Sequence, residues 1–255
     1  MAPSAMWKVL PHASRLAPLN PSRQSPRPNM PETRHIISRK FRPSDRAVVR
    51  KLCGDTGFLG NPIDPVFQDR ELFADYLTAY YTDIEPESAF VLEVDGEVHG
   101  YLLGSRHPLK QQVYNFFTNI RLFLRILLRY AGYSAASRKF VHWIALNAWR
   151  EVPAAPRSTA HFHINLLPDA RAISTTRVLM ESYLGYLKEH GERTVYGQMV
   201  VFGNRRGTQL FERYGFKVLN KAEITKYRDI HPEPVFLCTV VKDLEEHGAR
   251  MARVN

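Results

Sequence analysis

The chain has 255 residues, 44% of them hydrophobic, and a formal net charge of +10. This composition is sufficient for a folded core and excludes a wholly disordered protein. The two cysteines, Cys53 and Cys238, are too few for a disulfide framework and too far apart in sequence for a thiolate zinc motif. We therefore expect a cytoplasmic protein without a metal site.

The positive charge is concentrated in two segments. Residues 1–42 hold eight basic residues and one acidic residue, and residues 106–150 hold eight basic residues and no acidic residue. The rest of the chain is therefore net acidic. Because the basic residues lie in a tail and one internal segment, without a known binding motif, we do not expect nucleic acid as a partner.

Residues 1–33 are rich in Pro, Ser and Arg and are predicted to be a disordered basic tail, followed by one domain over residues 34–255. Within the domain, hydrophobic periodicity and turn residues predict alternating strands and helices. In chain order these are a strand at 35–41, helices at 43–52 and 68–80, strands at 89–94 and 97–103, helices at 111–130 and 138–149, a strand at 160–167, a helix at 174–190, a strand at 194–201, a helix at 205–214, and strands at 216–227 and 235–241. The pair Asp95-Gly96 predicts a type I′ turn between the second and third strands.

Residues 108–157 are predicted to be a helical insertion between the third and fourth strands. In its first helix, 111–130, Arg121, Arg125 and Arg129 recur at every fourth position and share one stripe, while hydrophobic residues cover much of the rest. Three arginines exclude a membrane-spanning helix. The pattern is compatible with peripheral contact with an anionic membrane, with a layer packed on the domain or across a homodimer, and with a wall of the substrate pocket.

The strand at 160–167, the turn that contains Arg171 and the helix that starts near Ser174 form a strand–turn–helix unit. The first N–H groups of a helix and the positive end of its dipole favour an anion such as a phosphate. Arg171 would add a charge-assisted hydrogen bond. By itself this pattern is common in proteins, so it indicates a phosphate site only together with the motifs around it.

Three motifs supply that context. They are His161-Phe-His-Ile-Asn-Leu-Leu-Pro-Asp-Ala-Arg171, Ser174-Thr-Thr-Arg-Val-Leu-Met180 and Asn204-Arg-Arg-Gly-Thr-Gln-Leu-Phe-Glu-Arg-Tyr-Gly-Phe216. They resemble the GNAT superfamily of acetyl-CoA-dependent N-acetyltransferases, and among its members bacterial proteins similar to the acetyltransferase-like domain of O-GlcNAcase. The resemblance implies an α/β fold with a mixed, twisted sheet flanked by helices, and acetyl-CoA as co-substrate.

The resemblance also implies roles for individual positions. Backbone groups of Leu166 and Leu167 would meet the acetyl and pantetheine part, the helix start would hold the pyrophosphate, and Asn204 would contact the pantetheine arm or brace the nearby loop. The residues expected to bind the cofactor are Leu166, Leu167, Arg171, Ala172, Ile173, Ser174, Thr175, Thr176, Arg177 and Asn204.

Four positions depart from the family pattern. Ser174 and Thr176 stand where the family has glycines, and their β-carbons would hinder close approach of the pyrophosphate unless their hydroxyls donate to it or cap the helix. Asn165 replaces an aspartate on the fourth strand and cannot act as a base. Phe211 replaces the tyrosine that commonly protonates the leaving thiolate.

The candidate catalytic residue is His163. It shares one face of its strand with His161 and Asn165, and histidine titrates in the range that suits a general base. The alternative is that both histidines are structural. A zinc site would need a third ligand, which the sequence does not offer.

Two functions follow from the resemblance. The first is an N-acetyltransferase that moves an acetyl group to a primary amine, of a small molecule or a peptide, by direct attack. The alternative is a catalytically weak or inactive CoA-binding module with a regulatory or interaction role.

Overall fold

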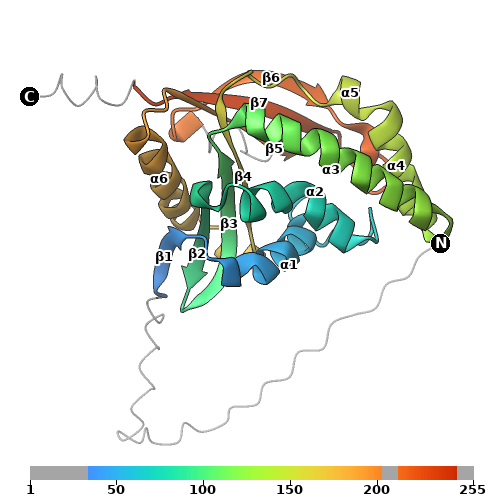
Figure 1. Cartoon of the computed structure of the whole chain (residues 1–255), viewed down its shortest axis with the longest axis horizontal. Helices are drawn as coiled ribbons and strands as arrows, with labels where there is room; N and C mark the ends of the chain where they lie inside the picture. Colours follow the sequence, from blue (N-terminus) through green and yellow to red (C-terminus); the bar gives the residue numbers. More distant parts are fainter. Residues whose placement is uncertain (1–33, 203–211, 246–255) are drawn as a thin grey trace, which may run out of the picture. The chain divides into compact units, whose positions relative to one another are not determined.

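The computed structural model describes residues 34–202 and 212–245, and its strands form one seven-stranded sheet in the order β1-β2-β3-β4-β5-β7-β6 (Figure 1). The strands are β1 (Ile36–Lys40), β2 (Ala89–Val94), β3 (Glu97–Ser105), β4 (Ala160–Leu166), β5 (Thr194–Phe202), β6 (Lys217–Glu223) and β7 (Val235–Asp243). Neighbouring strands are antiparallel except β4 and β5, which are parallel. The mixed sheet expected from the sequence is confirmed.

Helices lie between β1 and β2, between β3 and β4 and between β4 and β5. They are α1 (Arg46–Thr56), α2 (Arg70–Asp83), α3 (Pro108–Arg129), α4 (Ala135–Leu146), the short α5 (Ala148–Glu151) and α6 (Ile173–Glu189). Helices α3 to α5 lie between β3 and β4, so the segment expected to be an insertion is helical. That it is inserted relative to related proteins stays a prediction. The predicted tail at 1–33 and most of the predicted helix at 205–214 lie outside the described residues.

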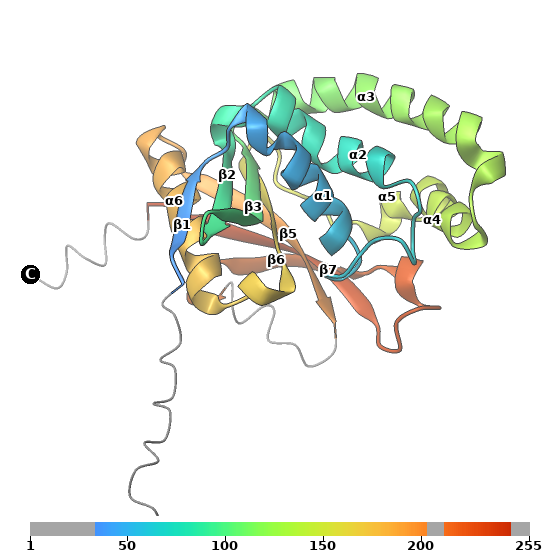
Figure 2. The same ribbon diagram turned by 90° about the horizontal axis from the view of Figure 1, so that it is seen from below.

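Different helices cover the two faces of the sheet. Successive residues of a strand point to opposite faces, and in β3 this places Tyr101 and Leu103 in one hydrophobic cluster and Leu102 in the other. The first cluster includes residues of α1 and α2, and the second is completed by α6. Figure 2 shows α1, α2 and α3 stacked on the same side of the sheet.

The tight turn between β2 and β3 follows the sequence pattern. Asp95 has φ 54° and Gly96 has φ 89°, so both central residues are left-handed, as a type I′ turn requires. The backbone N–H of His35 donates to the Asp95 carboxylate at 2.8 Å, which ties the start of β1 to this turn. Turn chemistry alone therefore located this hairpin.

Several element boundaries differ from the prediction by a few residues, and the ends of α1 and β6 are two of them. Gly54, which the sequence places in a loop, lies buried within α1, which continues to Thr56. The last strand but one was expected to reach Tyr227 but ends at Glu223. Its continuation turns away because Thr225 donates to the Glu151 carboxylate through its N–H at 2.6 Å and its hydroxyl at 2.7 Å.

A buried carboxylate fixes the passage from β3 to α3. Glu85 is fully buried and accepts hydrogen bonds from the hydroxyls of Tyr80, Ser88 and Ser105 and from the N–H of Arg106, at 2.6–2.8 Å. Burial alone would raise the pKa of Glu85, but these four donors outweigh it and lower the pKa. The direction in which the chain leaves the sheet is thus set by a charged hydrogen-bond hub.

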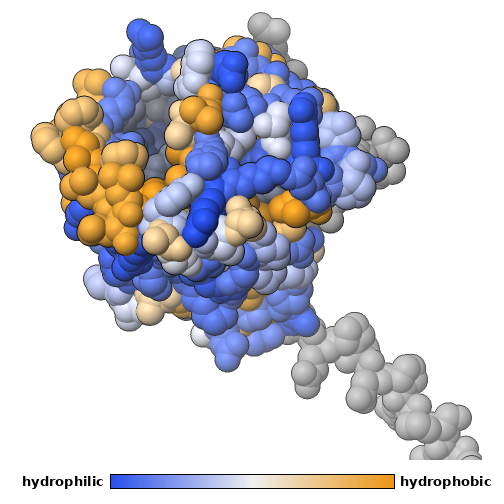
Figure 3. Space-filling view, turned by 90° about the vertical axis from the view of Figure 1, so that its right-hand side faces the viewer, coloured by the Kyte–Doolittle hydropathy of each residue, from blue (hydrophilic) through white to orange (hydrophobic). Residues whose placement is uncertain are grey.

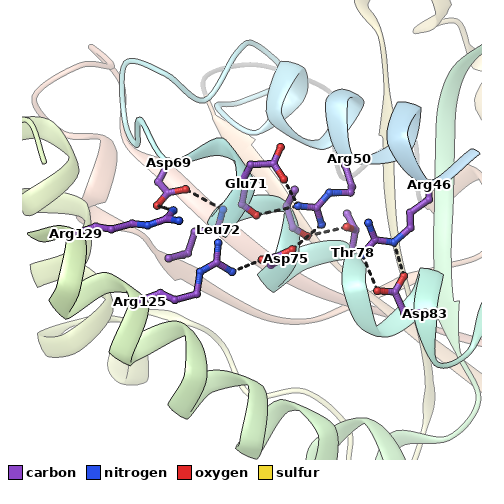
Figure 4. Close-up of polar contacts among 11 residues, drawn as sticks. Arg46, Arg50, Asp69, Glu71, Leu72, Asp75, Thr78, Asp83, Arg125 and Arg129 are labelled. Atoms are coloured by element: carbon purple, nitrogen blue, oxygen red, sulfur yellow. Dashed lines mark hydrogen bonds and ion pairs between the residues drawn. The ribbon is translucent and has the colours of Figure 1, made fainter. Parts of the chain in front are cut away.

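Arginines attach α3 to the helix beneath it. Arg125 contacts the carboxylate of Asp75, which also accepts from Arg50 of α1 at 2.7 Å, and Arg129 pairs with Asp69 at 2.7 Å (Figure 4). Of the three arginines on this stripe, Arg125 and Arg129 are thus paired with the domain, as the packed-layer alternative allows. They face the domain because α2 offers acidic partners there.

The aspartate shared by three helices gives a first test. Burial would raise the pKa of Asp75, but hydrogen bonds from Arg125 and Arg50 lower it. We expect Asp75→Asn to lower the free energy of unfolding by about 2 kcal/mol, because two arginines lose their anion. In the wild type, the ion pairs of Asp75 should contribute fully to the free energy of unfolding above the ordinary aspartate pKa of 3.8. This contribution should disappear as the pH falls further.

Hydrogen exchange in α3 distinguishes this clamp from a general effect on α2. Asp83 is the matched control, because it also lies on α2 and pairs with an arginine of α1, Arg46, at 2.7 Å, whereas its carboxylate forms no ion pair with α3 among the described residues. Asp75→Asn should speed exchange of the α3 amides, whereas Asp83→Asn should leave them slow. Equal exchange in the two variants would contradict the clamp.

Candidate functional site

The parallel pairing of β4 with β5 is short. The paired residues are Ala160 with Val195, His161 with Tyr196 and Phe162 with Gly197. Beyond Phe162, β4 continues along β3 as far as Leu166, whereas β5 continues along β7. Among the described strands, residues 163–166 thus have no partner on the β5 side. Backbone groups alternate between the two sides of a strand, and the Leu167 N–H is bonded to β3, so the N–H groups of Ile164 and Leu166 face the β5 side.

The end of β4 leads directly into the start of α6. The N–H of Leu167 donates to the carbonyl of His99 at 2.9 Å, which fixes the turn that follows. The Thr175 hydroxyl accepts from the Ala172 N–H at 3.1 Å and donates to the carbonyl of Ala170 at 2.5 Å. Thr176 donates to the carbonyl of Ala172 at 3.1 Å. Both threonine side chains therefore brace the loop from within.

This bracing leaves the helix start open. Thr175 and Thr176 are buried and Ser174 is exposed. The first N–H groups of an α-helix have no carbonyl partner inside the helix, so those at the start of α6 are free to bind an anion. At the two positions where the resemblance expects glycines, the Thr176 side chain is thus turned into the loop and Ser174 is exposed.

The two predicted arginines lie at opposite ends of this segment. Arg171 donates through Nε to the carbonyl of Leu166 at 2.9 Å and also contacts the carbonyl of Gly60, in the loop between α1 and α2. Arg177 is exposed and pairs with Glu181 one turn along α6 at 2.7 Å. The described cofactor candidates thus form one continuous stretch, while Asn204 and Phe211 lie outside the described residues.

His163 and Asn165 contact one tyrosine of the neighbouring strand. The Asn165 amide donates to the Tyr101 hydroxyl at 2.9 Å, and the His163 ring lies edge-on to the Tyr101 ring with centroids 5.5 Å apart. The Nδ1 atom of His163 is buried and has no hydrogen-bond partner among the described residues. The Nδ1 atom of His161 is buried without a partner in the same way.

The other histidine of β4 is held differently. His161 Nε2 lies 3.0 Å from the hydroxyl of Tyr81, which in turn accepts from the side-chain amide of Gln111 in α3 at 2.8 Å. The Tyr183 hydroxyl donates to the His161 carbonyl at 2.7 Å. His161 is thus part of a packed network that joins α3, α2 and β4.

Sequence reasoning missed both tyrosines. The register of β3 against β4, which places Tyr101 opposite Asn165, could have been derived by continuing the hairpin alternation into the next strand. Tyr81 lies on α2, 80 residues from His161, and no local signal in the sequence relates the two.

Burial decides the charge state of both histidines. Removal from water disfavours the imidazolium and, with a smaller effect of the nearby His161, lowers the pKa of His163 to about 4. The pKa of His161 is also lowered to about 4 by burial, against the charge of Glu85 and a backbone hydrogen bond, which raise it. Both rings are therefore neutral at physiological pH.

Comparison with known proteins gives a match in structure. No protein-family model matches the sequence, and no curated protein matches it. The crystal structure of SsHAT is 28% identical with a TM-score of 0.51, and the alignment covers 82% of this chain and 98% of that one. A structure described only as an acetyltransferase is 16% identical with a TM-score of 0.50, covering 82% and 99%.

An N-acetyltransferase from Staphylococcus aureus Mu50 is 15% identical with a TM-score of 0.49, covering 82% of this chain and 99% of that one. The first two matches establish a shared fold, and together with the mixed sheet and its flanking helices this is the GNAT fold.

The neutral histidine pair can be tested by titration. Because the folded chain binds these protons less readily than the unfolded chain, its stability is complete above the ordinary histidine pKa of 6.5 and falls toward pH 4. We expect a loss of about 1–2 kcal/mol per ring on going from pH 6.5 to about pH 5. NMR of the imidazole protons should show both rings neutral at about pH 5, and titration of either near 6.5 would contradict the burial argument.

Proposed function

We propose that the chain is an acetyl-CoA-dependent N-acetyltransferase that transfers an acetyl group to a primary amine by direct attack. The observation that supports it best is the parting of β4 from β5 directly before the open start of α6. Unpaired strand backbone and unsatisfied helix N–H groups then lie next to each other along the chain. The first suits an extended amide chain, and the second suits a pyrophosphate.

The residues present fit acetyl-CoA. In this proposal the Leu166 N–H binds the acetyl and pantetheine part, next to Leu167, whose own N–H and carbonyl are bonded to His99 and Ala170. The N–H groups of Ile173, Ser174 and Thr175 bind the pyrophosphate, and Arg171 and Arg177 flank it. The exposed Ser174 hydroxyl adds a donor at the helix start. Bound acetyl-CoA supplies the thioester whose carbonyl the amine attacks. Asn204 keeps its expected role beside the pantetheine arm.

His163 is the proposed base. Its unpartnered Nδ1 lies on the strand face that also carries Asn165, and its ring is neutral at pH 7. A base whose pKa is about 4 cannot hold a proton from an ammonium group for long, so the acceptor must arrive largely as the free amine. The rate should therefore rise with pH toward the pKa of the acceptor.

The nature of the acceptor and other partners is a separate part of the proposal. The expected acceptor is an amine of a small molecule or a peptide. Within the superfamily, the chain is expected to be most similar to bacterial proteins that resemble the acetyltransferase-like domain of O-GlcNAcase. The protein is expected to be cytoplasmic. A homodimer and contact with an anionic membrane through residues 111–130 are both expected partners, and both would use the solvent side of α3.

Substitution of Ser174 tests the cofactor site without weakening the fold. An acidic residue in the first turn stabilises a helix, so Ser174→Asp should hold or raise the melting temperature. The same carboxylate repels a pyrophosphate, so calorimetry should show acetyl-CoA affinity reduced by about tenfold or more.

Ser134 provides the control, because it caps α4 by accepting from the Ser137 N–H at 3.2 Å, a role that aspartate also performs. Ser134→Asp adds the same charge at another helix start and should leave acetyl-CoA binding unchanged. Absence of binding by the wild-type chain at about millimolar acetyl-CoA would overturn the cofactor assignment.

Substitution of His163 tests the base. We expect His163→Gln to lower kcat by about a hundredfold with a panel of polyamines, arylalkylamines and lysine peptides, while acetyl-CoA binding stays the same. His161→Gln should instead lower the melting temperature, because it breaks the contact with Tyr81. An unchanged kcat in His163→Gln would contradict the assignment of His163 as the base, and the free amine would then attack without help from a protein base.

A further inference from the structure

Helix α3 exposes more hydrophobic surface than it buries. Leu122 is its buried residue. We use the name α3 outer face for a set of hydrophobic side chains that are each 49–65% exposed: Val113, Phe116, Phe117, Ile120, Leu124 and Leu127. Figure 3 shows hydrophobic residues gathered on one side of the surface. A patch of this kind on a water-soluble domain marks an interaction site.

The orientation of the helix is fixed from the opposite side. Residues of an α-helix are rotated by about 100° from one to the next, which places Leu122, Arg125 and Arg129 on the side opposite to Ile120 and Leu127. Arg125 and Arg129 are held by Asp75 and Asp69 of α2 (Figure 4). The α3 outer face therefore cannot turn inward without breaking both ion pairs.

Basic residues border this face. By the same rotation Lys110 and Arg121 lie along one edge of it, and Arg121 has no ion-pair partner within residues 34–202 and 212–245. Residues 106–150 contain no acidic residue that could neutralise them. The surface thus combines an exposed hydrophobic band with an uncompensated positive edge.

We propose that the α3 outer face binds to the surface of an anionic membrane, with the helix lying in the plane of the interface. Hydrophobic and aromatic side chains would enter the boundary between headgroups and acyl chains, and Lys110 and Arg121 would contact anionic headgroups. In this proposal the membrane is contacted by the hydrophobic face and its basic edge, and not by the stripe of Arg121, Arg125 and Arg129, because Arg125 and Arg129 pair with the domain. In the described part of the chain, no helix is long and apolar enough to cross a membrane.

Charge favours this occupant over two others. A second copy of the chain would bring two positive edges together without an acidic residue from the same segment to offset them. Residues 1–33 hold four basic residues and one acidic residue, so they do not complement a basic edge either. An anionic lipid surface supplies both the apolar layer and the opposite charge.

Vesicle flotation of the full chain tests the proposal, and it needs neither acetyl-CoA nor activity. The wild type should float with vesicles of phosphatidylcholine containing about 30 mol% phosphatidylserine, bind pure phosphatidylcholine much less, and detach at about 1 M salt. The double variant Ile120→Ser/Leu127→Ser should bind the anionic vesicles at least about tenfold more weakly. Arg121→Glu should weaken the same binding several-fold.

A matched control comes from β6 and the segment between β6 and β7. Ile230 and Leu219 are 44% and 54% exposed, close to the 49% and 55% of Ile120 and Leu127. Ile230→Ser/Leu219→Ser should therefore float like the wild type. All variants keep residues 1–33, so binding through the tail would survive in every one of them and would overturn the proposal. A dimer in the absence of vesicles that only Ile120→Ser/Leu127→Ser dissociates would also overturn it, in favour of a second copy.

Discussion

The three-residue ladder between β4 and β5 is the constraint on which the rest of the structure depends. It joins the antiparallel half that contains β1 to β4 to the half that contains β5 to β7. Phe162, at its end, packs against Tyr183 of α6 and Phe216 with ring centroids 6.0 and 5.7 Å apart. A longer ladder would close the opening between β4 and β5, and a shorter one would leave the two halves of the sheet joined by fewer hydrogen bonds. The ladder therefore supports an opening while keeping one continuous core.

The side of β4 that faces α1 and α2 is polar at its centre although the surroundings are hydrophobic. His161, His163 and Asn165 alternate along the strand and meet tyrosines rather than water. Neutral imidazoles and hydroxyls can be buried there at modest cost because most of their hydrogen bonds are satisfied. Among the described residues, the Nδ1 atoms of His161 and His163 are the two positions of this network without a hydrogen-bond partner.

Local patterns predicted the features that local forces determine. The Asp95-Gly96 turn, the alternation of β2 and β3 and the helix after Ala172 follow from residues close in sequence. The ion pairs of the arginines could not be predicted in this way. Periodicity places Arg125 and Arg129 on one stripe, but it does not show that Asp75 and Asp69 lie next to that stripe in the fold. The role of the threonines likewise depends on the path of the loop. Burial of His163, and hence its low pKa, depends on packing from helices far away in the sequence.

The inward arginines of α3 have a consequence for how this sequence can change over generations. Hydrophobic residues in a core are retained because their replacement lowers stability. The residues of the α3 outer face contribute little to stability and reduce solubility, so selection for folding alone would let them drift toward polar types. Arg125 and Arg129 would be kept in either case, since they hold the helix to α2. If divergent chains retain Arg125 and Arg129, the fold explains it. If they also retain the hydrophobic residues of the α3 outer face, contact with another molecule explains it.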